Sequence, residues 1–326
     1  MALLFALILA VVSIILITKG SDWATDSLVP VAKKLGTSNI AVAIILVSIM
    51  VSLPEIIISI YSTLLGHINI SLGVIIGSII CNIGLMTGLS AMIKPLPVSK
   101  SLILRDGIFA VTIAITVLVL SMDKQITQAE GAVFILMFIP YLINVWVQEK
   151  AKHEEQKKQE LKDIELELNF IGLQFAHLKA GLGTFFLGVV VLLAGSYLFT
   201  EALIQIANFS GISDLLIGLT IGAIGPSIPN IVTAVQGTLK NIDEMAVSET
   251  LGSDIFTLLV TLGILSMIQP INLANSWLVF DIPVMVIMSI LMLVFMVYKQ
   301  GISRLQGSIL FFSYIAVLVT NIFLHI

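Results

Sequence analysis

The sequence predicts an all-α membrane protein with ten transmembrane helices, arranged as two inverted five-helix repeats in which helices 2 and 7 are broken. Three observations predict this fold: an apolar composition, a duplicated pattern of Gly, Pro and Ser, and a one-sided distribution of basic residues. Hydrophobic residues make up 58% of the 326-residue chain and charged residues only 11%, whereas about 25% charged residues is usual in soluble domains. The chain is therefore expected to cross a membrane many times.

Ten apolar segments are long enough to span a bilayer, for which about 20 mostly apolar residues are typical. They lie at about 2–18, 40–65, 70–93, 106–121, 128–147, 181–200, 215–238, 246–268, 276–298 and 306–325. The chain contains one cysteine, Cys81, which excludes an intramolecular disulfide and a cysteine-based metal cluster.

The duplication relates residues 20–95 to residues 195–270 with a constant offset of 175 and no gap. The matching positions are mostly Gly, Pro and Ser, which shape the backbone and line polar paths, rather than the Leu and Ile that would match by chance. They include the pairs Gly20 and Gly195, Ser52 and Ser227, Pro54 and Pro229, Gly77 and Gly252, and Ser78 and Ser253. Duplicated membrane units of this kind usually build transporters.

The basic residues predict the orientation of the spans, because Lys and Arg accumulate in short cytoplasmic loops. If the termini and the connections after spans 2, 4, 6 and 8 share one side, only Lys124 of the 16 Lys and Arg residues lies on that side. Both termini are therefore expected to be extracellular. Because five is an odd number, the second repeat should enter the membrane from the side opposite to the first.

The chain is thus predicted to contain a first repeat at residues 1–147, a cytoplasmic linker at 148–179 and a second repeat at 180–326. Compact spans without a soluble sensor domain favour a multi-pass protein of the plasma (inner) membrane of a prokaryote.

A carboxylate stands in the middle of the second span, within Ser52-Leu53-Pro54-Glu55. Pro54 removes a backbone donor and should break this helix near the bilayer centre. A charged side chain at that depth costs about 2.5–3.5 kcal/mol on insertion scales, so it usually has a binding function. The repeat partner in span 7 runs from Pro226 through Ser227 and Pro229 to Asn230, and it should place further oxygens at the same midplane site.

Spans 3 and 8 are expected to form the other walls of this site. Ser78 and Asn82 are four residues apart, as are Ser253 and Thr257, so each pair shares one helical face. Hydroxyl, amide and carboxylate oxygens without His or Cys clusters suit Na⁺ or Ca²⁺ rather than a transition metal.

Two further acids in span 8 leave two interpretations open. Asp254 follows Ser253 directly and should point about 100° away from the Ser253–Thr257 face, so it either lines the ion path or lies outside it. Glu249 lies one turn before Ser253, nearer the membrane edge, and the same two interpretations apply to it.

These motifs resemble the cation/Ca²⁺ exchanger superfamily, and most closely its prokaryotic sodium/calcium exchanger branch. The resemblance covers both repeats and rests on Gly20-Ser21-Asp22-Trp23, Ser52-Leu53-Pro54-Glu55, Gly77-Ser78 with Asn82-Ile83-Gly84, Gly218-Leu219-Thr220, Ser227-Ile228-Pro229, and Gly252-Ser253 with Ile255-Phe256. It implies ten helices in two inverted halves and four ion sites in a diamond between spans 2, 3, 7 and 8. It also implies that spans 1 and 6 slide across this core to expose the sites alternately to each side.

The resemblance implies a ligand for each matching position. Glu55 matches the acidic ligand of the first repeat and Asn82 the polar ligand of span 3. The serine ligands are matched by Ser52, Ser227, Ser78 and Ser253. Val51 and Pro226 replace the usual threonines, although their carbonyls remain suitable ligands, and Thr257 replaces a usual Asp or Asn. Asn230 stands where the family has a second acid.

The lone acid Glu55 leaves the choice of ion open, because Ca²⁺ in a desolvated site is held better by two carboxylates than by one. The leading interpretation is exchange of Ca²⁺ for Na⁺ by alternating access. The alternative is a monovalent antiporter that moves Na⁺ or K⁺ against H⁺ or each other, with protonation of Glu55 as a coupling step.

Other classes of function fit the sequence less well. No phosphate-binding loop is present, which argues against a nucleotide-driven pump. An intramembrane aspartyl protease needs two facing aspartates, and no second span carries a central one. We therefore expect a protein that is not an enzyme, without a cofactor or a nucleic-acid partner, whose partners are inorganic cations and the lipid bilayer.

Overall fold

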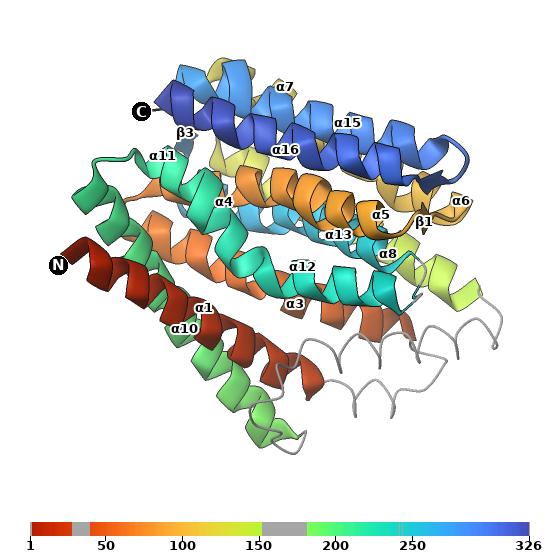
Figure 1. The fold of residues 1–326 in the computed structure, drawn as a ribbon, viewed down its shortest axis with the longest axis horizontal. Helices are drawn as coiled ribbons and strands as arrows, with labels where there is room; N and C mark the ends of the chain where they lie inside the picture. Colours follow the sequence, from red (N-terminus) through yellow and green to blue (C-terminus); the bar gives the residue numbers. More distant parts are fainter. Residues whose placement is uncertain (1, 28–39, 152–180, 241, 243, 326) are drawn as a thin grey trace.

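The computed structural model describes residues 2–27, 40–151, 181–240, 242 and 244–325. Long helices run roughly along one direction in three layers (Figure 1). The pair α1 (Ala2–Asp26) and α10 (Leu182–Ser210) lies on one side, and α15 (Ile282–Val297) with α16 (Arg304–His325) lies on the other. The helices that carry the predicted site lie between these two layers.

The remaining elements of the first half are α3 (Ile40–Leu64), α4 (Ile68–Cys81), η2 (Asn82–Thr87), α5 (Gly88–Ile93), β1 (Leu96–Pro97), α6 (Lys100–Leu102), η3 (Ile103–Gly107), α7 (Ile108–Leu120), η4 (Ser121–Asp123), β2 (Gln125–Ile126) and α8 (Gln128–Ala151). Those of the second half are α11 (Asp214–Ile217), η5 (Gly218–Gly222), α12 (Ala223–Leu239), α13 (Met245–Phe256), η6 (Thr257–Thr261), α14 (Leu262–Ile268), β3 (Ile271–Asn272), η7 (Trp277–Asp281) and β4 (Gly301–Ile302). The η elements are π-helical, except η4, which is a 3₁₀ turn.

Within the described residues, nine helical segments are long and apolar enough to cross a membrane. A further helix, α3, is 25 residues long and coincides with the expected second span at 40–65. Two spans are longer than predicted, because α1 continues to Asp26 and α10 to Ser210. Lys19 and Asp22 form an i,i+3 ion pair of 3.5 Å within α1, so the polar end of this helix stays helical.

The boundaries of α10 and α11 follow local chemistry. α10 ends at Gly211, which adopts a left-handed φ of 71°, a conformation that glycine reaches without strain. Ser213 then caps α11 by accepting a hydrogen bond from the backbone N–H of Leu216. Of the predicted linker at 148–179, residues 148–151 continue α8, and the rest lies outside the described residues.

The predicted breaks in helices 2 and 7 are not found, because both spans are helical through their prolines. α3 runs through Pro54 as one α-helix, because a proline removes a single N–H and the neighbouring helical bonds and packing partners hold the segment together. The seventh span is also helical from Asp214 to Leu239. Its irregularity is the π-helical segment η5, which lies just before Pro226 and Pro229 and widens the turn without ending the helix.

The two halves contact each other reciprocally. α5 packs against α16, and α14 of the second half packs against α8 of the first. The four short strands, which the all-α prediction did not include, follow the same pattern: β1 pairs with β4, and β3, which lies 175 residues after β1, pairs with β2. Such reciprocal pairing is the pattern that a two-fold axis between the halves produces.

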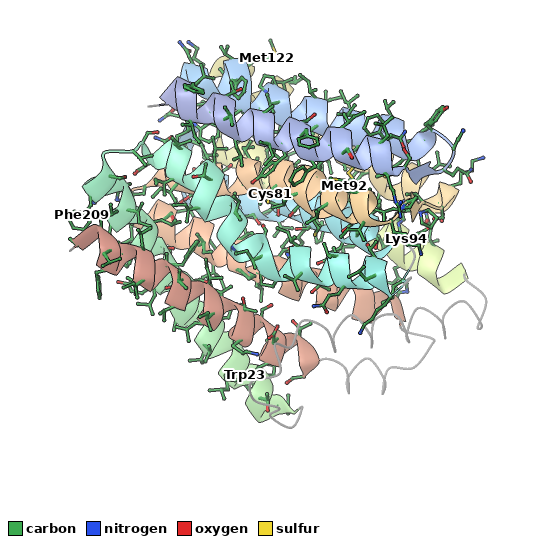
Figure 2. The ribbon with its side chains drawn as sticks, viewed as in Figure 1. Trp23, Cys81, Met92, Lys94, Met122 and Phe209 are labelled. Atoms are coloured by element: carbon green, nitrogen blue, oxygen red, sulfur yellow. The ribbon has the colours of Figure 1, made fainter. Side chains whose placement is uncertain are left out.

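Backbone atoms meet closely where the halves cross. A Cβ on Gly73 of α4 would lie 2.6 Å from the Cα of Gly218, and one on Gly20 of α1 would lie 2.4 Å from the backbone nitrogen of Leu192. Small residues allow this approach in membrane proteins, where close van der Waals packing holds helices together. The central layer is tightly packed for this reason. In Figure 2, Cys81 lies in this layer, whereas Met122 and Phe209 lie at the ends of their helices.

Candidate cation site

Four helical segments from the two halves meet around the predicted site. α3 and α4 come from the first half, α12 and α13 from the second, and each of them contacts the other three. Spans 2, 3, 7 and 8 are therefore the walls of one centre, as the repeated motifs predicted. The predicted site residues lie near the middle of α3 and of the continuous spans Ile68–Ile93, Asp214–Leu239 and Met245–Ile268.

Glu55 on α3 is the buried acid at this centre, and its side chain is 1% exposed. Its Oε1 lies 3.5 Å from Oγ of Ser227 on α12, across the boundary between the halves. The Ser227 hydroxyl also donates to the backbone oxygen of Ala223 at 2.9 Å, so its contact with Glu55 is the weaker of the two. Glu55 Oε2 and the Ser52 hydroxyl have no hydrogen-bond partner among the described residues. One oxygen of the Glu55 carboxyl group is thus left to bind something else.

A second polar contact crosses between the halves at Asn82, the first residue of η2. Its Nδ2 donates to Asp254 Oδ1 at 3.1 Å and lies 3.5 Å from Ser253 Oγ. Asn82 is 1% exposed, and its Oδ1 has no partner in the described part of the chain. Oδ1 is therefore another buried oxygen available to a cation.

The structure places Asp254 beside the Asn82 amide, at the boundary between the two halves. The carboxylate is 4% exposed and contacts Asn82 together with its neighbour Ser253. Ser253 and Asp254 are adjacent on a helix and point about 100° apart. The Asn82 amide group lies opposite them and contacts both. Glu249 is half-buried, five residues earlier on α13.

The other predicted ligands also lie in this region. Ser78 donates its hydroxyl proton to the backbone oxygen of Ile75 at 3.0 Å, which leaves its lone pairs free to face a cation. Asn230 is 6% exposed, and its Nδ2 has no partner among the described residues. Pro226 and Thr257 are buried on α12 and at the start of η6. The backbone of Val51 belongs to α3, whereas its side chain lies outside the described residues.

Three buried threonines on the spans that form the site were not among the predicted ligands. Thr87 and Thr250 join η2 to α13 through a hydroxyl contact of 2.7 Å. Under the offset of 175 they correspond to Leu262 and Ile75, so the repeat carried no signal for them. Thr233 is buried, with a hydroxyl that has no partner among the described residues. Its position one turn after Asn230 on an apolar helix was a signal that could have identified it.

The donor set is suited to a hard cation. Two carboxylates from different halves are accompanied by hydroxyl and amide oxygens, and the described residues contain no group of three His, Cys, Asp or Glu side chains arranged to hold a metal. Oxygen-only coordination is typical of Na⁺, Ca²⁺ and Mg²⁺, while softer metals take nitrogen or sulfur. The arrangement can therefore strip water from a hard cation and replace it with protein oxygens.

Comparison with protein families gives a match that covers most of the chain. A family model described as sodium/calcium exchanger protein matches residues 5–147 and 180–323. The two matched ranges correspond to the predicted repeats, and the unmatched residues between them fall in the predicted linker.

Individual relatives and solved structures agree with this match. The sodium/calcium exchanger MaX1 of Methanosarcina acetivorans is 27% identical, over 96% of this chain and 97% of the relative. A putative antiporter, CaxA, of Alkalimonas amylolytica is 32% identical, over 82% of each chain. A structure of the sodium-calcium exchanger NCX_Mj soaked with Na⁺ and Sr²⁺ superposes with a TM-score of 0.67 at 27% identity, covering 97% of this chain and 98% of that one.

Proposed function

This chain belongs to the sodium/calcium exchanger protein family, and we propose that it exchanges Ca²⁺ for Na⁺ by alternating access at the site around Glu55. It is a multi-pass membrane protein and a cation antiporter of the exchanger type, in a family of transporters rather than enzymes. We propose which ions are exchanged, which residues bind them and how the helices move.

One observation carries the proposal: the Glu55 carboxylate is buried in the centre of four transmembrane segments, and one of its oxygens has no partner in the described residues. An ionised carboxylate at such a depth is unfavourable unless a cation neutralises it. The candidate ligand oxygens of Ser52, Ser78 and Asn82 are neutral, so a bound cation or a proton must balance the charge of Glu55. A transported cation supplies that charge.

The proposed ligand set comprises Glu55, Ser52, Ser78, Asn82, Ser227, Asn230, Ser253, Asp254 and Thr257, with the backbone carbonyls of Val51 and Pro226. Two kinds of ion compete for these oxygens. Each fully occupied state balances the buried charge and permits movement, whereas a partly occupied site leaves charge unbalanced in a low dielectric and holds the helices still.

The packing of α1 and α10 supports alternating access. These two helices lie side by side, and both contact α3, which carries Glu55. α1 also contacts α12, which carries Ser227. Because these helices cover the site from one side, sliding them across α3 and α12 would change which end of the site meets water.

We infer ten spans in two inverted halves, with extracellular termini in a prokaryotic plasma membrane, from the reciprocal packing and the basic residues.

A monovalent antiporter is the second candidate, and Asn230 favours it. This residue occupies the position equivalent to Glu55 in the second half but carries no charge. If Glu55 is the only carboxylate that binds the ion, the site suits exchange of Na⁺ or K⁺ against H⁺ or each other, since a single positive charge neutralises it.

The test is ion uptake by proteoliposomes that contain the purified protein. Uptake of radioactive Ca²⁺ should require Na⁺ inside the vesicles and should stop when K⁺ replaces that Na⁺ at equal pH. Na⁺ or K⁺ flux driven by a pH gradient, without Na⁺-dependent Ca²⁺ uptake, would instead support the monovalent antiporter.

Glu55→Gln should reduce Ca²⁺ uptake to background while the protein remains folded, because the amide lacks the charge that binds the ion. Glu130→Gln is the matched control, since it is the same chemical change at a helix start, where Glu130 accepts hydrogen bonds from Thr127. Unchanged flux in Glu55→Gln would remove this residue from the mechanism.

A further inference from the structure

The two halves place their central carboxylates on different helices. Glu55 on α3 corresponds to Asn230 under the offset of 175, whereas Asp254 on α13 corresponds to Ile79. The first half thus carries its acid on the second span, and the second half carries its acid on the eighth. Both acids are nonetheless buried in the segments that surround one site.

We propose that Asp254 supplies the second negative charge of the cation site, replacing the charge that Asn230 lacks, and that this displaced pair of acids selects a divalent ion. The inference rests on the exchange function proposed above and extends it to the class of ion. It assigns the preference for a divalent ion to Asp254, whose equivalent in the first half is the apolar residue Ile79.

The contacts of Asp254 place it beside an available ligand atom. Its Oδ1 accepts from Asn82 Nδ2 at 3.1 Å, and the same amide reaches Ser253 at 3.5 Å. Asn82 Oδ1 is buried without a partner among the described residues. An amide carries its oxygen about 2.3 Å from its nitrogen, so the unsatisfied Asn82 Oδ1 lies at most about 5.4 Å from Asp254 Oδ1. A cation there would gain an amide oxygen and a carboxylate together.

A second contact fixes the face of α13 that bears Asp254. Thr250 lies one turn earlier, and its hydroxyl is 2.7 Å from that of Thr87. Residues four apart share a helical face, so Thr250 and Asp254 both face η2. The carboxylate is therefore held toward Asn82 by the packing of α13 on η2, not by its hydrogen bond alone.

A purely structural role does not require a charge at this position. An asparagine would accept the same hydrogen bond from Asn82 without the cost of burying a carboxylate in the membrane. With Glu55 and Asp254 both ionised, Ca²⁺ brings the site to neutrality, whereas one Na⁺ leaves a negative charge. The pair of acids therefore favours Ca²⁺ or two Na⁺ ions over a single monovalent ion.

The test compares Asp254→Asn with wild type in Na⁺-dependent Ca²⁺ uptake, measuring half-saturating concentrations of both ions. The Coulomb energy scales with the charge of the ion, so the fold-loss for Ca²⁺ should be about the square of that for Na⁺. A loss of about tenfold for Na⁺ then implies about a hundredfold for Ca²⁺. The double variant Asp254→Asn with Asn230→Asp should recover Ca²⁺ affinity, because it returns a carboxylate to the site at the position equivalent to Glu55.

Asp281→Asn is the matched control, since Asp281 is also a fully buried acid but lies in η7, outside the four segments of the site. It should leave the half-saturating Ca²⁺ concentration unchanged. Asp254→Ser provides a second neutral variant if Asp254→Asn does not fold, and it should show the same unequal losses. Equal losses for the two ions, or a change below about threefold in both, would overturn the assignment of Asp254. Wild-type protein without Na⁺-dependent Ca²⁺ uptake would overturn the exchange function itself.

Discussion

Gly73→Ala tests whether the close crossing of the two halves holds the cation site together. The added Cβ would lie 2.6 Å from Gly218 Cα and 2.7 Å from the Gly218 carbonyl carbon and the Leu219 nitrogen. Carbon atoms in ordinary contact are about 3.5–4.0 Å apart, so α4 and η5 must separate by roughly 1 Å. All three obstructing atoms belong to the backbone, so no side-chain rotation can relieve the clash.

The expected cost of Gly73→Ala is about 1–3 kcal/mol of stability, the usual range for overpacking a well-packed core. The same displacement moves Ser78 and Asn82, which lie further along α4 and at the start of η2, away from α12. A binding site loosened by about 1 Å loses much of its function, so the half-saturating Ca²⁺ concentration should also rise.

The assay for Gly73→Ala is thermal unfolding of the purified protein in detergent, followed by Ca²⁺ uptake in proteoliposomes. Gly183→Ala is the control, because a Cβ there meets no atom within 4 Å. A Gly73→Ala variant with the unfolding midpoint and Ca²⁺ affinity of wild type would refute the inferred close contact.

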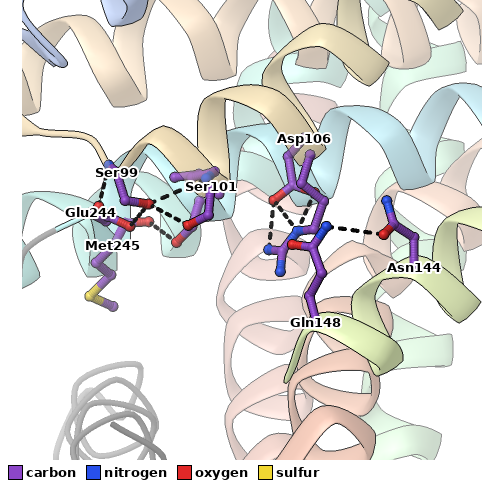
Figure 3. Close-up of polar contacts among 10 residues, drawn as sticks. Ser99, Ser101, Asp106, Asn144, Gln148, Glu244 and Met245 are labelled. Atoms are coloured by element: carbon purple, nitrogen blue, oxygen red, sulfur yellow. Dashed lines mark hydrogen bonds and ion pairs between the residues drawn. The ribbon is translucent and has the colours of Figure 1, made fainter. Parts of the chain in front are cut away.

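Two further substitutions test the charge of the cation site and the contact between Glu244 and Ser99. Asn230→Glu adds a carboxylate at the position equivalent to Glu55, so it should raise Ca²⁺ affinity by about tenfold or more; a neutral or weakened response in the uptake assay would count against the charge argument. Glu244→Ala removes the acceptor for the backbone N–H and hydroxyl of Ser99 (Figure 3), and it should destabilise the protein by about 1–3 kcal/mol. Thermal unfolding in detergent measures that loss, and a midpoint equal to that of wild type would show that the contact contributes nothing.

Glu55 shows how far the sequence could predict the site. Its isolation as an acid within an apolar span, and its place beside a repeated Ser-x-Pro motif, predicted a buried group facing the second half, and the structure places it against Ser227. Composition and repeat spacing were sufficient to predict Glu55 as a site residue. Burying a charge in a membrane is so unfavourable that a charged residue there usually has a function. The break expected at Pro54 was wrong, since the loss of one hydrogen bond does not end a helix whose neighbours remain packed.

The partner of the Asp254 side chain could not be predicted from the sequence. Helical geometry alone could not choose whether this side chain joins the ion path, because the answer depends on which residue of another helix lies opposite. The structure places the Asn82 amide there, and the contact between Thr87 and Thr250 holds the two segments in that register. No spacing within α13 or η2 carries that information.

The apolar spans, the duplication, the sidedness of the basic residues and the family are properties of the sequence by itself, because each depends on residue types at fixed intervals along the chain. Tertiary structure alone decided the position of the π-helical turns, the reciprocal packing of the halves and the partner of Asp254. These features depend on contacts between residues far apart along the chain, such as Asn82 and Asp254, which are 172 positions apart. Such contacts follow from how the helices fit together in three dimensions, which no local pattern encodes.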